Sequence, residues 1–173
     1  MRLYSRTELP ELLGLATIRA CHLETRDEYR SDSEHSAMRQ FLDGEIDDPG
    51  GAWFDPWART VTDLVGRGVA VQRARIVSVP PTDYTRYLIA LTPHNLEAGE
   101  DVRWLARDHA DRADAAADDF WLIDDHTVAY SVFDADGWWS GVAATSDAQI
   151  VGYACALWDR VWHKSVSHEH FRT

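Results

Sequence analysis

The run from Val69 to Val79 constrains the fold of this chain more than any other segment. Its β-branched residues are typical of a buried strand, which the following Pro80 ends. Because side chains alternate along a strand, Arg73 and Arg75 lie on the same face. A guanidinium group inside a sheet is costly unless it meets a carboxylate or an anionic ligand. The sequence therefore predicts a sheet that contains a buried charged site.

The arginines of the chain are unevenly distributed. The formal net charge is -12, yet five of the sixteen arginines fall within one slightly positive stretch: Arg73, Arg75, Arg86, Arg103 and Arg107. This contrast marks the stretch as the candidate site. The acidic remainder repels phosphate backbones and anionic lipid surfaces, so we expect no direct nucleic-acid binding and no membrane binding.

The order of the sequence patterns indicates an α+β fold. Apolar residues recur at helical spacing over about 7–19, 33–43, 55–66, 83–91 and 146–162, and Thr92 and Pro93 restart a short helix. Runs typical of strands lie between these helices and dominate residues 102–144. We expect a single α+β domain over residues 1–173, with an antiparallel or mixed sheet of about five strands covered by helices on at least one face.

The composition also bears on the compartment. No apolar run approaches a membrane span, and Met1 to Leu15 contains acids and a proline where a signal peptide needs an apolar core. We therefore expect a cytoplasmic protein in which Cys21 and Cys155 are reduced thiols. A single lysine beside sixteen arginines, with abundant Ala, Asp and Gly, is typical of a GC-rich genome and favours an actinomycete-like bacterial source.

Three arginines of the positive stretch come from consecutive elements that must pack together: Arg75, Arg86 and Arg103. Their planar guanidinium groups suit a carboxylate or a phosphate, and Tyr84 and Asn95 add neutral hydrogen-bonding groups. The first interpretation is a site for a small anionic ligand.

An internal salt-bridge network is the alternative interpretation of the same arginines. Glu24, Asp83 or Glu100 would then neutralise them. The sequence leaves both interpretations open.

Linear catalytic motifs are absent from the sequence. It has no Gly-rich phosphate loop, no GxSxG, no HExxH and no nucleophile with a nearby base, and we expect no cofactor and no metal. His163, His168 and His170 near the C-terminus fit a solvated tail better than a metal site. Trp138 and Trp139 follow a turn, so one of them must face away from the core, which makes the pair a candidate partner surface.

Several short motifs occur in a fixed order: Leu23–Tyr29, Arg73–Val77, Asp83–Tyr87, Thr92–Asn95, Gly99–Arg103 and Asp119–Asp124. Over about residues 10–165, their order and spacing resemble an actinobacterial domain family of unknown function that is often encoded beside helix-turn-helix regulators. The resemblance implies an accessory, regulatory protein. Its motif positions overlap the arginine site: Glu24, Arg26, Tyr29, Arg75, Tyr84, Arg86, Asn95, Glu100 and Arg103.

The C-terminal part, Phe120 to Trp162, is similar to the terminal strands and helix of phospholipase-D-like domains. Those enzymes need a His-x-Lys motif, and His126-Thr127-Val128 lacks the lysine. The similarity therefore implies a fold used for sensing, without the hydrolase chemistry.

Two functions fit these observations. The first is a non-catalytic accessory domain that binds a partner regulator or a small anionic effector through the arginines. The alternative is an enzyme of a biosynthetic pathway that holds a carboxylate or phosphate substrate with the same arginines and uses Glu24 or Glu100 as acid or base.

Overall fold

A computed structural model describes residues 1–31 and 34–172. In chain order, the strands are β1 (Arg2–Ser5), β2 (Arg19–Glu24), β3 (Ala70–Val77), β4 (Asp101–Ala106), β5 (Phe120–Ile123), β6 (Thr127–Phe133), β7 (Trp139–Thr145) and β8 (Val166–Ser167). The α-helices are α1 (Leu9–Leu13), α2 (His35–Leu42), α3 (Asp55–Gly66), α4 (Asp83–Ala98), α5 (Arg112–Ala115) and α6 (Ala148–Lys164), and two 3₁₀ turns follow β4 and β8.

All strands belong to one mixed sheet in the order β1-β7-β6-β5-β2-β3-β4-β8. The central strands β2, β3 and β4 are parallel, and the remaining pairs are antiparallel. The α+β class with a mixed sheet is confirmed, but the expected size of about five strands was wrong, since the sheet has eight. The exposed strand β1 and the two-residue strand β8 lie at the edges, where little burial imposes a sequence pattern.

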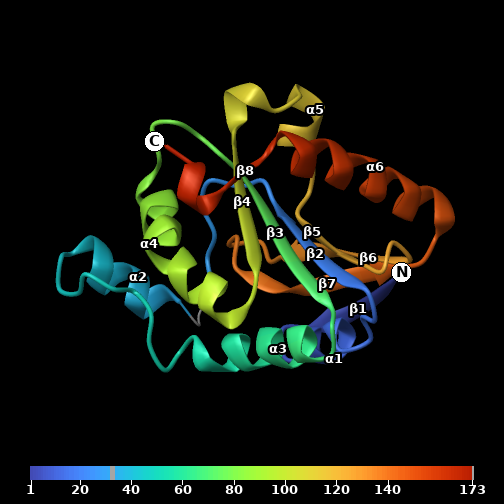
Figure 1. Ribbon diagram of the computed structural model, residues 1–173, viewed down its shortest axis with the longest axis horizontal. Helices are drawn as coiled ribbons and strands as arrows, with labels where there is room; N and C mark the ends of the chain where they lie inside the picture. The colour runs from blue at the N-terminus through green and yellow to red at the C-terminus, as the bar shows by residue number, and fades with distance from the viewer. Residues whose placement is uncertain (32–33, 173) are drawn as a thin grey trace.

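Helices cover both faces of the sheet (Figure 1). Helix α6 packs on one face through Ala154, Leu157, Trp158 and Val161, which are all almost completely buried. On the other face, α1 and α3 enclose one apolar cluster, and α4 packs on a second with α2 at the periphery (Figure 1). Each fully buried large side chain contributes about 1.5–3 kcal/mol relative to its exposed state, so these clusters hold the layers together.

Helix α4 borders the candidate site and continues through Pro93, contrary to the expected restart at Thr92. The Thr82 hydroxyl caps its N-terminus by accepting from the Thr85 N–H at 3.1 Å, and Gly99 ends it in the left-handed region at φ 107°. Although Pro93 removes one helical hydrogen bond, the Thr92 hydroxyl donates to the Leu88 carbonyl at 2.7 Å. The helix therefore presents one continuous face to the sheet.

In the described part of the chain, no helix combines the length and the apolar character needed to cross a membrane.

Candidate functional site

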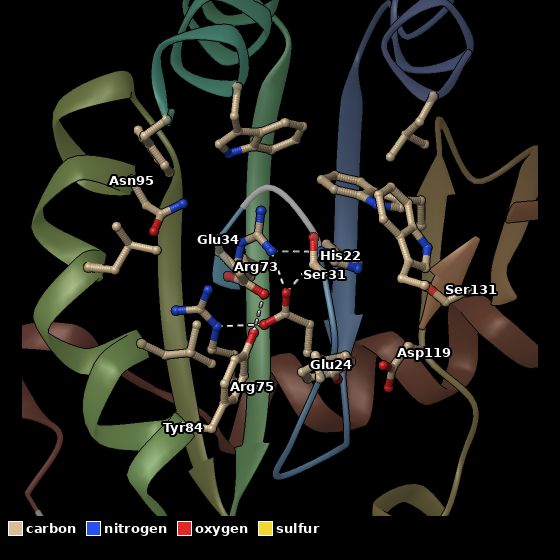
Figure 2. Close-up of a pocket in the computed structure, with 18 of the residues that line it drawn as sticks. His22, Glu24, Ser31, Glu34, Arg73, Arg75, Tyr84, Asn95, Asp119 and Ser131 are labelled. Carbon is tan, nitrogen blue, oxygen red and sulfur yellow. Dashed lines mark hydrogen bonds and ion pairs between the residues drawn. The ribbon is translucent and has the colours of Figure 1, made fainter. Parts of the chain in front are cut away.

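The register of the central strands brings four polar side chains together on one face of the sheet. His22 of β2 pairs with Arg73 of β3, and Glu24 pairs with Arg75. In parallel strands, paired residues point to the same side, so the four form a square beneath α3 and α4. Figure 2 shows Glu24 between the two arginines.

Both arginines are buried and paired with carboxylates. Arg73 donates from Nε to Glu100 at 2.8 Å and from Nη1 to Glu24 at 2.5 Å. Arg75 donates from Nε to Glu24 at 2.5 Å and from Nη1 to the Thr92 hydroxyl at 3.0 Å. Although burial opposes ionisation of Glu24, the charges of Arg75 and Arg73 hold its pKa well below the usual value. Glu24 is therefore ionised at neutral pH.

His22 is a neutral member of this network. Its Nδ1 lies 2.8 Å from Arg73 Nη1, and because a guanidinium can only donate, Nδ1 accepts and the hydrogen of the ring is on Nε2. Burial, followed by the charge of Arg73, lowers the pKa of His22 to about 3. The ring stacks on Trp121 at 4.2 Å with an interplanar angle of 10°.

Above this floor lies a pocket of about 240 Å³. Its walls come from the sheet, from α4 and from the segments that lead into α2 and α3 (Figure 2). The walls are rich in aromatic rings, which belong to Tyr29, Trp53, Phe54, Trp57, Tyr84, Trp121, Phe133 and Trp139. Such a concave, mostly apolar surface with several fixed polar groups is the usual form of a small-molecule site.

Two further carboxyl groups line the pocket. Glu34 accepts a hydrogen bond of 2.9 Å from the Tyr84 hydroxyl, and burial raises the pKa of Glu34 to about 7. Asp119 accepts from the Thr25 N–H at 2.7 Å and from its hydroxyl at 2.8 Å. Burial also raises the pKa of Asp119. Glu34 can therefore gain or lose a proton when a ligand changes its surroundings.

Some of the residues expected at the site meet here, and others do not. Glu24, Arg75, Tyr84 and Asn95 line the pocket, and Glu100 lies behind its wall, where it is bonded to Arg73.

Arg86 and Arg103 lie elsewhere. Tyr84, Leu88, Leu91 and Asn95 form the pocket-facing stripe of α4, whereas Arg86 is exposed and pairs with Asp83 at 2.6 Å. Arg103 pairs in register with Ala74, so it points to the opposite face, where it lies over the Trp162 ring at 4.1 Å.

Arg26 lies near the edge of the pocket, and so do the consecutive residues Trp138 and Trp139. Arg26 is exposed and lies over the Phe133 ring at 3.9 Å. Trp139 lines the pocket, and Trp138 packs near the His35 ring at 5.8 Å. Both tryptophans are half-buried.

The site also contains residues that were not expected there, among them His22, Glu34, Asp119, Trp57 and Trp121. His22 shares a polar strand face with Glu24, and this alternation was visible in the sequence. The contribution of Trp121 depends on the pairing of β5 with β2, which no local pattern shows.

No cluster of metal ligands accompanies the pocket. Across residues 1–31 and 34–172, no three His, Cys, Asp or Glu side chains are grouped so that they could hold a metal ion. Near the C-terminus, His170 Nδ1 lies 2.7 Å from the Ser167 hydroxyl, and His168 lies beside the Trp104 ring.

Solved structures share this fold. A phospholipase D family member, Nuc from Salmonella typhimurium, aligns with a TM-score of 0.57 at 10% identity over 97% of this chain and 91% of its own. NucT from Helicobacter pylori aligns with a TM-score of 0.54 at 12% identity over 96% of this chain and 97% of its own. The similarity therefore extends over nearly the whole chain and beyond the C-terminal part where it was expected. At this identity it shows the fold alone.

No curated protein matches the chain. A family model described as a domain of unknown function, DUF6879, matches residues 7–173. The chain therefore belongs to the DUF6879 family.

Proposed function

We propose that this domain is a non-catalytic accessory module that binds a small organic molecule in the pocket above β2 and β3. The observation that carries the proposal is a cavity with aromatic walls whose floor is a buried, mutually neutralised set of charges. Buried ion pairs are often no more stabilising than apolar packing of the same volume. Because these ion pairs lie on the central strands, they are better explained as a rigid binding surface than as a source of stability.

The proposal includes the regulatory role that the sequence resemblance implies, with a helix-turn-helix protein as partner. It also bears on the charge of the effector. A small anion was the expected ligand, but both arginines that line the pocket already pair with carboxylates. Glu24 and Glu100 already balance the charges of both arginines, so the geometry favours an effector without negative charge.

The alternative of a biosynthetic enzyme with Glu24 or Glu100 as acid or base has less support. Glu24 is held ionised between two arginines, so it is a poor acid and a weak base. Glu100 accepts from Trp57, Asn95 and Arg73, which occupies both of its oxygens. His22 Nδ1 is occupied by Arg73, so this histidine has no free lone pair for nucleophilic attack.

A pocket-blocking variant tests the proposal. Ser131 lines the cavity from β6, and Ser131→Phe should fill part of it, whereas Ser140→Phe, at an exposed position of β7, is the matched control. A metabolite library is screened by thermal shift, and native mass spectrometry examines the purified protein for a retained ligand. We expect compounds that stabilise the wild type and Ser140→Phe but not Ser131→Phe. Equal stabilisation of all three proteins, with Ser131→Phe folded by circular dichroism, would refute the location of the site.

A further inference from the structure

Two buried hydrogen-bond acceptors of the pocket have no partner. Asn95 and Asp119 are each 2% exposed, and Asn95 Oδ1 and Asp119 Oδ2 accept no hydrogen bond. The Tyr29 hydroxyl lies close enough to Asp119 to stabilise its ionised form, yet Oδ2 is not satisfied by it. Buried acceptors without donors are costly and uncommon in folded proteins. Figure 2 shows Asn95 and Asp119 on opposite sides of the pocket, so a ligand donor would satisfy one of them.

The pocket and its immediate wall hold more carboxyl groups than arginines. Two arginines and four carboxyl groups lie in the pocket or directly behind its wall: Arg73, Arg75, Glu24, Glu34, Glu100 and Asp119. Glu24 and Glu100 neutralise the two arginines, and His22 adds no positive charge. Glu34 and Asp119 are left without a cationic partner among the pocket residues. A positively charged ligand would provide one.

Aromatic rings provide the third condition for binding a cation. Arg73 already lies over the Trp57 ring at 5.5 Å and near the Trp121 ring at 5.7 Å, so a ligand cation would use the other rings of the wall. Tyr29, Tyr84 and other rings line the remaining wall. An aromatic enclosure with carboxylates at its edge is a common arrangement for binding organic ammonium groups.

We infer that the pocket takes a small organic cation, an amine attached to an aromatic or apolar group, whose N–H groups donate to Asp119 and whose charge is balanced by Asp119 and Glu34. This inference rests on the proposed function and specifies the ligand class of that site. The raised pKa values of Glu34 and Asp119 agree with it, because a cation favours their ionised forms. Binding should therefore release protons between the unperturbed pKa of Glu34 at 4.5 and its value of about 7 in the folded protein.

A ligand series that varies only the head group tests the inference. The probes are 2-phenylethylamine, 2-phenylethanol and phenylacetate, which present a cation, a neutral hydroxyl and an anion on the same ring. We expect the amine to bind at least about 10-fold more tightly than the alcohol in calorimetry, and phenylacetate to bind most weakly. Titration of the amine in two buffers of different ionisation enthalpy should show protons leaving the protein.

Two variants separate the ligand class from the existence of the pocket. Glu34→Gln keeps an acceptor for Tyr84 and removes the charge, so it should weaken the amine by about 10-fold and leave the alcohol unchanged. Asp119→Asn replaces the unpaired Oδ2 acceptor by an NH₂ donor, so it should weaken the amine most and the alcohol to a smaller extent. Asp83→Asn, an exposed substitution on α4, should change neither ligand.

Each outcome of the series has a defined meaning. Equal binding of the three probes, or tightest binding of phenylacetate, would overturn the cation inference while leaving the proposed pocket intact. Failure of the amine to bind would also overturn the inference. If no compound of the library stabilised the wild type, that result would instead count against the proposed function.

Discussion

Glu24→Gln is the substitution that best tests the buried network. Glu24 accepts from Arg73 and from Arg75, each at 2.5 Å, and only 13% of its side-chain surface is exposed. The glutamine oxygen can accept from one arginine, but its NH₂ group must then face the other, so two donors oppose each other. Arg73 keeps Glu100, whereas Arg75, 4% exposed in its side chain, loses its carboxylate partner.

The expected cost follows from the burial of Arg75. Removing one partner of a buried ion pair costs about 3–5 kcal/mol, because the remaining charge is desolvated without compensation. A second substitution, Arg75→Met in the Glu24→Gln background, removes that charge and should recover part of the loss. The comparison is Asp83→Asn, which breaks the exposed Arg86 pair and should cost less than about 1 kcal/mol.

Urea denaturation followed by tryptophan fluorescence measures these free energies of unfolding. A loss below about 1 kcal/mol for Glu24→Gln would refute the reasoning, since it would mean that water reaches Arg75 freely. No recovery in the double variant would show that the destabilisation comes from packing and not from the unpaired charge.

Three further predictions concern other groups. The folded-state pKa of Glu34 is raised from 4.5 to about 7, so the contribution of Glu34 to the free energy of unfolding is fully present below pH 4.5 and is lost as the pH rises through about 7. Glu34→Gln should therefore be more stable than wild type at pH 8, by about 2–3 kcal/mol, and equally stable near pH 4.5. Thermal or urea unfolding across this pH range measures the difference. Burial raises the pKa of Cys21 to about 12, so iodoacetamide in native buffer should label the half-buried Cys155 first, and mass spectrometry would locate the adduct. Dithiothreitol should leave Tm unchanged, and a drop of several degrees would reveal a disulfide. The acidic chain should bind no random duplex DNA at physiological salt, and a micromolar Kd in fluorescence anisotropy would contradict this.

Periodicity within single elements predicted much of the architecture. The β-branched run around Arg73 and Arg75 is a central strand with both arginines on one face, as expected. The α+β class followed from the order of such runs. The sheet edges could not be predicted, because an exposed strand such as β1 has no buried face to impose alternation. Helix α4 was expected to restart at Thr92 and Pro93, because the local rule for proline ignores tertiary packing. Leu88, Leu91 and Asn95 are buried on both sides of Pro93, so the helix continues through it.

The site was predictable only as far as strand register could be read from the sequence. Arg103 was expected beside Arg75, but its pairing with Ala74 sends it to the α6 face, while Trp104 pairs with Arg75 and lies 5.1 Å from its guanidinium carbon. A one-residue change in register exchanges the two faces, and the sequence of β4 alone does not set the register. The same argument explains why Trp121 was missed, since only its pairing with His22 brings it over the polar floor. Charged residues on a predicted central strand therefore identify the site, and its remaining members follow once the neighbours of that strand are known.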